Sequence, residues 1–174
     1  MILDGLLLFT AAPGTGDLPT TGTQSSTNVL DLGITGLPTS ASGGGARDIG
    51  IGDDPAMKLL VQVMTAFTAG TSLQIVLQGA PDNGSGAPGT YTTMLSGPVV
   101  AEASLIVGAR LLDDDMPRPI PGQALPRFLR LQYVTVGTHT AGAVIGTMVL
   151  DRHDLPEQAN AVLGGYPPGI VIAN

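Results

Sequence analysis

Two acidic segments hold the side chains of this chain that could bind a metal ion. "LLDDDMPRP" (111–119) contains three successive carboxylates, Asp113–Asp115. "DRHDLPE" (151–157) adds Asp151, His153, Asp154 and Glu157. Calcium takes six to eight oxygens from alternating loop positions, and neither segment has that spacing or the glycine of a tight calcium loop. A calcium site pooled from both segments stays an alternative. We favour a solvated turn at a strand end, balanced by the arginines nearby in sequence, Arg118, Arg127 and Arg152.

The sequence gives little support for nucleophilic or acid–base catalysis. The two histidines are His139 and His153, and the chain lacks the G-x-S-x-G elbow that would place a catalytic serine. It contains no cysteine, which removes thiolate catalysis, disulfides and cysteine zinc sites. Many carboxylates could form an acid–base pair, and none stands out. The sequence therefore predicts a protein that is not an enzyme and has no cofactor and no metal.

Two glycine-rich stretches look like phosphate loops but lack the helix that such loops need. "GSGAPG" (84–89) matches G-x-G-x-x-G, yet Pro88 and the strand-like "TYTTML" occupy the place of a helix. "ARDIGIGDD" (46–54) is followed by Pro55 and a strand-like run. We interpret 84–89 as a hairpin loop. We interpret 46–54 as structural, with both isoleucines pointing inward where an N-terminal arm enters the domain.

Charge and composition limit the partners. Seven basic against fourteen acidic residues give a net charge of −7, so nucleic acid is not expected as a partner. No window approaches the roughly 18 apolar residues of a membrane span, and "MILDGLLLF" lacks the basic n-region of a signal peptide. Charged residues make up 12% of the chain, where about 25% is usual. We expect other subunits to cover a surface so poor in charge.

The elements that position these residues are predicted to be strands. Residues 1–46 are interpreted as an apolar N-terminal hook and a Gly/Ser/Thr-rich arm with one isolated strand in 27–34. This segment has too little apolar surface to fold alone, so it is either disordered or held by another surface. Residues 47–174 are interpreted as the folded domain, with an apolar C-terminal strand or tail.

Period-two alternation predicts the strands of the domain. One face of 58–68 carries Leu59, Val61, Val63, Thr65 and Phe67, and one face of 71–79 carries Leu73, Ile75 and Leu77. Further strands are expected at 90–96, 101–112, 127–137 and 141–151, with hairpins at Gly70 and at "GTHTAG" (137–142). Residues 98–109 fit a short helix or a strand. The pattern predicts an all-β, jelly-roll β-sandwich with an extended, irregular N-terminal arm.

Four stretches carry a family resemblance: "MILD-LL-F" at the start, "SSTNVLDLG" (25–33), "RDIGIG" (47–52) and "RFLRLQYVTVG" (127–137). The chain resembles the capsid cement, or decoration, proteins of short-tailed Bordetella-type bacteriophages. The resemblance implies a jelly-roll homotrimer, made in the host bacterial cytoplasm, that sits on the outer surface of the head. There it would clamp neighbouring major capsid protein subunits. The chain departs from the family pattern in the insert at 11–24 and the extension at 151–165.

Interface residues are expected at both ends of the chain. The apolar hook supplies the candidate anchors Ile2, Leu3, Leu6, Leu7, Leu8 and Phe9. The tail ends in an apolar run that a neighbouring subunit could cover, with Ile170, Val171 and Ile172 as candidates. Two other functions remain open. One is a tail- or fibre-associated sandwich that binds host glycans, which the absence of tryptophan disfavours. The other is a metal-dependent β-sandwich enzyme.

Overall fold

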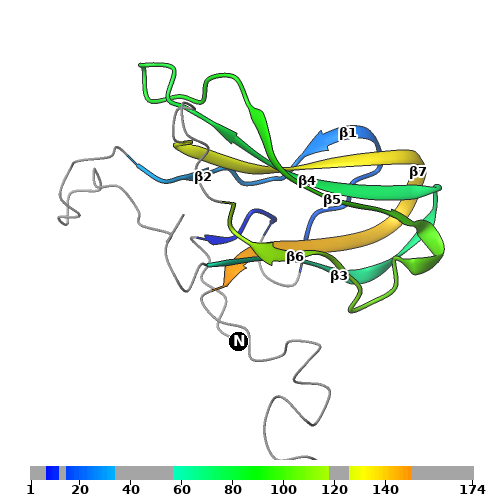
Figure 1. The fold of residues 1–174 in the computed structure, drawn as a ribbon. Helices are drawn as coiled ribbons and strands as arrows, with labels where there is room; N and C mark the ends of the chain where they lie inside the picture. The colour runs from blue at the N-terminus through cyan, green and yellow to red at the C-terminus, as the bar shows by residue number, and fades with distance from the viewer. Residues whose placement is uncertain (1–6, 12–14, 34–56, 118–125, 150–174) are drawn as a thin grey trace, which may run out of the picture.

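The computed structural model describes residues 7–11, 15–33, 57–117 and 126–149. Its elements are β1 (Thr21–Ser25), β2 (Leu30–Asp31), β3 (Lys58–Ala69), β4 (Ser72–Ala80), β5 (Thr92–Ala101), the 3-10 helix η2 (Glu102–Ser104), β6 (Arg110–Asp115) and β7 (Phe128–Val149). The sheet order is β5-β4-β7-β3-β6, and β1 and β2 also pair with β7. This all-β sandwich confirms the predicted jelly-roll fold class (Figure 1). Within the described residues, no helix is long and apolar enough to cross a membrane.

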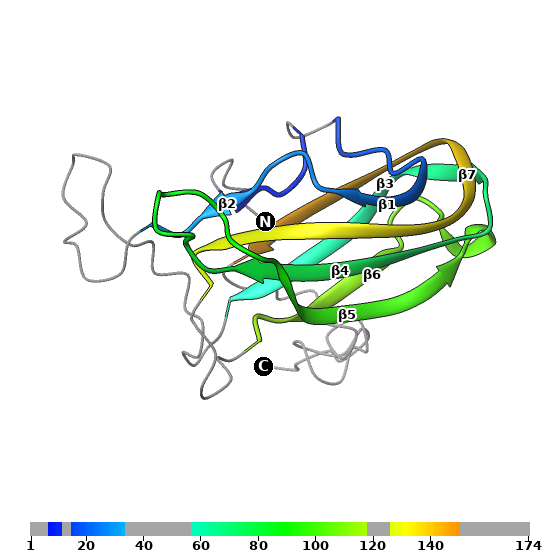
Figure 2. The same ribbon diagram turned by 90° about the horizontal axis from the view of Figure 1, so that it is seen from above.

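β7 is a single strand of 22 residues that belongs to both layers of the sandwich (Figures 1 and 2). Its first half pairs antiparallel with β4, and Val136 lies opposite Ser72. Its second half pairs antiparallel with β3, where His139 lies opposite Ala69. β3 and β4 therefore act together as one long partner of β7. The ladder that they form folds over at its middle, and the two halves become the two layers.

The hairpins predicted at Gly70 and at 137–142 are wrong. β3 and β4 do not pair with each other, and β7 runs through "GTHTAG" without reversing direction. Gly70 and Gly137 have φ angles of 77° and 79°, in the left-handed region that glycine adopts readily. A Cβ atom built on Gly137 would lie 2.9 Å from the Cα of Gly70. The two glycines thus let β7 and its partner, β3 followed by β4, bend together at close range. We call this part of the sandwich, around Gly70 and Gly137, the bend.

Three further details differ from the sequence-based expectation. β1 lies in a Gly/Thr-rich stretch without apolar alternation, and it forms because β7 offers it a partner, with Thr23 opposite Val134. β2 lies within the predicted strand at 27–34 and pairs with β7, so it is not isolated. Residues 98–109 divide between the end of β5, η2 and a loop. The boundary expected after residue 46 lies outside the described residues, as do 46–54 and the tail.

The core lies between the two layers. The predicted inward face of β4 is confirmed, because Leu73, Ile75 and Leu77 are all fully buried. The opposite face is also covered from Val76 on, where Gln78 is buried, so β4 is not the half-buried strand that the alternation suggested. In β3, Leu59, Val61, Val63 and Phe67 are buried as well. Thr65, expected on the same face, is exposed, since the register with β7 shifts on both sides of it. β7 contributes inward side chains from both of its halves, among them Leu129, Leu131, Tyr133, Val144 and Met148.

Candidate functional site

The N-terminal segment, residues 7–11 and 15–33, lies along the edge of β7 that β3 and β4 leave free. The Phe9 amide donates to the Gly146 carbonyl at 2.8 Å, and Asp17 and Val144 exchange two backbone hydrogen bonds of 2.9 Å. Further along, the Ser26 amide donates to the Leu131 carbonyl at 2.8 Å. The described part of the predicted arm is therefore held by its own sandwich. Of the two alternatives for these residues, disorder or attachment to another surface, the structure shows attachment.

Two of the predicted anchors are part of the chain's own core. Leu8 is 3% exposed and Phe9 is fully buried, while Leu7 is partly buried against the same cluster. The edge of β7 gives these side chains an apolar surface within their own chain, whereas the sequence had suggested them as anchors for a neighbouring subunit. The remaining candidates, Ile2, Leu3, Leu6, Ile170, Val171 and Ile172, lie outside the described residues.

Phe9 provides a test of how firmly the segment is held. Replacing Phe9 with alanine is expected to lower the free energy of unfolding by about 3–5 kcal/mol, because it leaves a cavity in a fully buried position. Urea denaturation monitored by circular dichroism would measure the change. Val29→Ala, on the same segment but 45% exposed, is the matched control and should change stability by less than about 0.5 kcal/mol. A small effect at Phe9 would contradict the packing of this segment.

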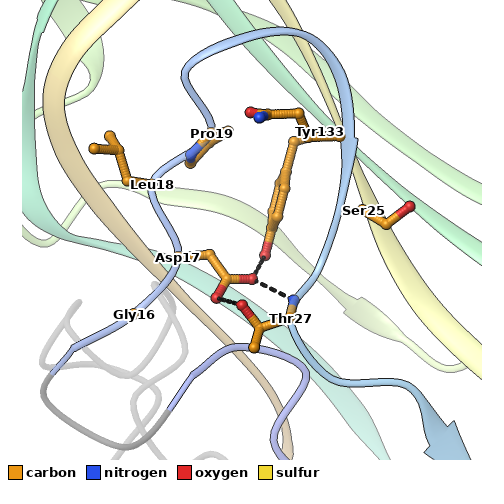
Figure 3. Close-up of a pocket in the computed structure, with 8 residues that line it drawn as sticks. Gly16, Asp17, Leu18, Pro19, Ser25, Thr27 and Tyr133 are labelled. Carbon is orange, nitrogen blue, oxygen red and sulfur yellow. Dashed lines mark hydrogen bonds between the residues drawn. The ribbon is translucent and has the colours of Figure 1, made fainter.

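Asp17 is the polar centre of the segment, and it lines a shallow pocket of about 180 Å³ with Tyr133, Thr27, Gln24 and Leu18 (Figure 3). Its Oδ1 accepts hydrogen bonds from the Ala11 amide at 2.9 Å and the Thr27 hydroxyl at 2.6 Å. Its Oδ2 accepts from the Thr27 amide at 2.9 Å and the Tyr133 hydroxyl at 2.8 Å. One carboxylate thus joins two parts of the segment to β7.

These bonds indicate a structural clamp. A carboxylate has about four acceptor positions, and four donors fill them, so Asp17 retains no free lone pair for a metal ion. Burial raises the pKa of Tyr133 far above its usual value, and the neighbouring Asp17 carboxylate raises it further. The hydroxyl therefore stays protonated and keeps donating. No motif in the sequence singles out either residue, although Asp17 is the only charged residue between Asp4 and Asp31.

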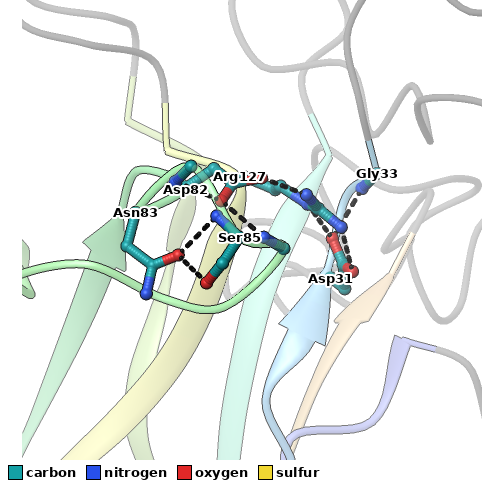
Figure 4. A network of polar contacts seen from close by, with 8 residues as sticks. Asp31, Gly33, Asp82, Asn83, Ser85 and Arg127 are labelled. Atoms are coloured by element: carbon teal, nitrogen blue, oxygen red, sulfur yellow. Dashed lines mark hydrogen bonds and ion pairs between the residues drawn. The ribbon is translucent and has the colours of Figure 1, made fainter.

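A second polar cluster fastens the other end of the segment (Figure 4). The Arg127 guanidinium binds Asp31 through two parallel bonds, from Nε at 2.8 Å and from Nη2 at 2.9 Å. Its Nη1 also donates to Asp82. Asp82 accepts the amides of Gly84 and Gly86, and these bonds, followed by Arg127, lower its pKa. Arg127 therefore joins β2 and the 81–91 loop to the start of β7, whereas the sequence had suggested that it balances Asp113–Asp115.

Asp113–Asp115 are the last three residues of β6, and the predicted turn is not formed there. Lys58 and Asp115 lie opposite each other and form an ion pair of 2.6 Å, whose hydrogen bond raises the pKa of Lys58. Arg110 Nη1 lies 3.3 Å from Asp113 Oδ2. Within the described ranges, no group of three or more histidine or acidic side chains is arranged to hold a metal ion. The second acidic segment, 151–157, lies outside those ranges.

His139 lies inside the bend. Its side chain is 1% exposed, Nδ1 is 2.8 Å from the Ala69 carbonyl, and the ring meets Phe67 edge to face with centroids 5.0 Å apart. Backbone carbonyls and an aromatic edge surround it, so it helps to hold β3 and β7 together at the bend. "GSGAPG" forms part of the loop between β4 and β5, as predicted, and no helix follows it.

In the described residues, the polar clusters join strands and loops of the sandwich to one another. The fold and these clusters together therefore define a structural β-sandwich protein. The comparison with known proteins gives the family. Residues 18–148 match the family Bbp16, a family of Bordetella phage proteins, and the chain belongs to this family. The match begins one residue after Asp17 and ends one residue before the end of β7. It includes three of the four stretches that carried the resemblance, namely 25–33, 47–52 and 127–137. No curated protein matches the chain.

Proposed function

We propose that this chain is a capsid cement protein, a structural virion component that binds the outer surface of the phage head as a trimer and clamps neighbouring major capsid subunits. Membership of a phage protein family over residues 18–148 is the observation that carries the proposal. The role is structural and asks for no catalytic residue or cofactor. It requires a stable domain with a large contact area, since a specific interface buries about 1,600 Å².

The structure supports this role through the way the body is held together. The N-terminal segment, the 81–91 loop and β7 are joined by Asp17 and Arg127, so the described residues form one unit. A rigid unit loses little conformational entropy when it binds a shell, and repetition around the shell multiplies the contacts through avidity.

The glycan-binding alternative receives no support from the described aromatic residues. Sugar sites present aromatic faces to solvent, whereas Phe9, Phe67, Phe128 and Tyr133 are all buried. The ring of Tyr91 is covered by Arg130, whose guanidinium carbon lies 3.7 Å from the ring centroid. The third tyrosine, Tyr166, lies outside the described residues.

Removal of residues 1–6 tests the proposal and the anchor role of Ile2, Leu3 and Leu6. The full chain is expected to co-sediment with undecorated heads built from the major capsid protein of the same phage. The truncated chain should bind at least about tenfold more weakly, because each buried Leu or Ile contributes about 1.5–3 kcal/mol. Truncation at residue 9 would be a poor test, since it also removes Leu8 and Phe9 from the core.

A chain in which residues 2–6 are replaced by an equal number of glycines and serines is the control for length. Both variants should unfold at the same temperature as the full chain. No binding of the full chain to heads would contradict the cement function, whereas full binding by the truncated chain would contradict only the anchor role.

A further inference from the structure

The loop between β4 and β5 brings together, around Asn83 and Gly84, the groups that can convert an asparagine into an aspartate. Residues 82–86 are exposed, so water reaches them. Gly84 has no side chain that could obstruct its own backbone nitrogen. Apart from the neighbouring residues, no atom lies within 4 Å of a Cβ placed on Gly84, so the loop is open at this point.

In this conversion, the backbone nitrogen of the following residue attacks the side-chain carbonyl carbon of the asparagine. A bond from the Gly84 nitrogen to Asn83 Cγ forms, the bond from Cγ to Nδ2 breaks, and ammonia leaves, so that a cyclic imide remains. Water then opens the imide to aspartate or isoaspartate. The reaction needs a base for the proton of the attacking nitrogen and donors for the negative charge that develops on Oδ1.

Asp82 supplies the base. Its Oδ1 accepts the Gly84 amide at 2.8 Å, within the range of about 2.6–3.2 Å over which a general base takes a proton. Its Oδ2 is bound by Arg127 Nη1, which holds the carboxylate in place. The amides of Gly84 and Gly86, together with Arg127, keep the pKa of Asp82 below its usual value. The carboxylate is therefore ionised and able to accept a proton at neutral pH.

Ser85 supplies the donors for the developing charge (Figure 4). Its amide lies 2.9 Å and its hydroxyl 2.7 Å from Asn83 Oδ1, distances within the range of about 2.7–3.1 Å over which donors stabilise an oxyanion. Asn83 Nδ2, the leaving group, has no hydrogen-bond partner among the described residues. The Asn83 amide donates to the Ala87 carbonyl at 2.9 Å, which fixes the backbone before the reacting bond.

We propose that Asn83 is a self-modification site, at which the folded loop promotes the conversion of Asn83 to aspartate or isoaspartate. Asp82 takes the proton of the Gly84 nitrogen, and the two Ser85 donors stabilise the charge on Oδ1. The proton then passes to Nδ2, which leaves as ammonia. The product places a new negative charge beside the Asp82–Arg127 pair that joins this loop to β2. This inference does not depend on the proposed capsid function.

Asn28 lacks this arrangement and serves as an internal control. Its Nδ2 donates to the Thr10 carbonyl at 2.6 Å and to the Leu8 carbonyl at 3.2 Å, so the would-be leaving group is held. The residue that follows it is the branched Val29, which crowds the attacking nitrogen. Asn28 should therefore remain unmodified while Asn83 reacts.

The rate of the reaction in the folded and the unfolded chain tests the inference. The full chain is incubated at neutral pH and physiological temperature, once in buffer and once in concentrated guanidinium chloride. Peptide mass spectrometry measures the modified fraction at each asparagine over time. The unfolded chain keeps the Asn-Gly sequence but loses the placement of Asp82 and Ser85. We expect the folded chain to react at Asn83 at least about tenfold faster, since a positioned base alone contributes about a hundredfold or more.

Two variants assign the roles. Asp82→Asn keeps an acceptor oxygen for the Gly84 and Gly86 amides but removes the base, so its folded rate should fall to that of the unfolded chain. Ser85→Ala removes the hydroxyl donor and keeps the amide donor, so its rate should lie between those of Asp82→Asn and the wild type. Circular dichroism checks that both variants are folded.

A folded rate equal to or below the unfolded rate would overturn the inference, because the hydrogen bond to Asp82 would then hold the Gly84 nitrogen back. An Asp82→Asn variant that reacts as fast as the wild type would overturn it as well, since the carboxylate would not be the base. Modification that occurs at Asn28 and spares Asn83 would also contradict it.

Discussion

Replacing Asp17 with alanine is expected to lower the free energy of unfolding by about 4 kcal/mol, because one substitution leaves four donors without their acceptor. The Tyr133 hydroxyl belongs to the most deeply buried side chain among them, since Tyr133 is 1% exposed. The Ala11 and Thr27 amides lose their partner as well. Urea denaturation monitored by circular dichroism would give the difference.

Tyr133→Phe is the matched control for Asp17→Ala. It removes one of the four hydrogen bonds and leaves the carboxylate with its other three donors, so we expect a loss of about 1–1.5 kcal/mol. Asp17→Asn should fall between the two variants, because the amide keeps one acceptor oxygen and turns the other into a donor. An Asp17→Ala variant as stable as Tyr133→Phe would show that Asp17 does not join the segment to β7 as a clamp.

Replacing Gly137 with alanine is expected to destabilise the protein by about 3 kcal/mol or more. Two effects add at this position. The φ angle of 79° places an L-residue in the left-handed region, at about 1–2 kcal/mol. The new Cβ would also lie 2.9 Å from the Cα of Gly70 and 3.0 Å from the Thr71 nitrogen. These are backbone atoms, so relief would require the two strands to separate at the bend. Thermal unfolding and urea denaturation would both report the loss.

Gly22→Ala separates the two effects. Gly22 also has a positive φ, 64°, but no atom lies within 4 Å of a Cβ placed there. Its substitution should therefore cost only the conformational part, about 1–2 kcal/mol. Equal losses at both positions would mean that the close approach of β3–β4 and β7 at the bend contributes nothing, and that the bend is looser than the structure shows.

The sequence by itself determined the class of fold and the inward faces of the main strands. Alternation of apolar side chains in β3 and β4 identified Leu59, Val61, Leu73, Ile75 and Leu77 as core residues, because a strand with one buried face must repeat every two residues. Short stretches such as 127–137 also carried enough of the family pattern to indicate a phage protein, and the family match agrees with this coarser assignment.

Only the tertiary structure decided what the glycines at Gly70 and Gly137 do. A glycine between two apolar runs is compatible with a reversal of the chain or with a bend in a continuous strand, since local sequence fixes the permitted φ and not the partner of the next residues. Here the partner is the same on both sides. β7 continues along β3 after β4, so a predicted pair of hairpins became one folded ladder.

The tertiary structure also decided the fate of the N-terminal segment and its polar contacts. Asp17 and Tyr133 are 116 positions apart, and Asp31 and Arg127 are 96 apart. No periodicity or spacing rule reaches across such separations, because such contacts exist only once the strands between them have paired. Composition alone predicted an arm with too little apolar surface to fold. For residues 7–11 and 15–33, the same chain offers the free edge of β7. Backbone hydrogen bonds to that edge hold these residues in place, together with the buried Phe9 and the Asp17 carboxylate.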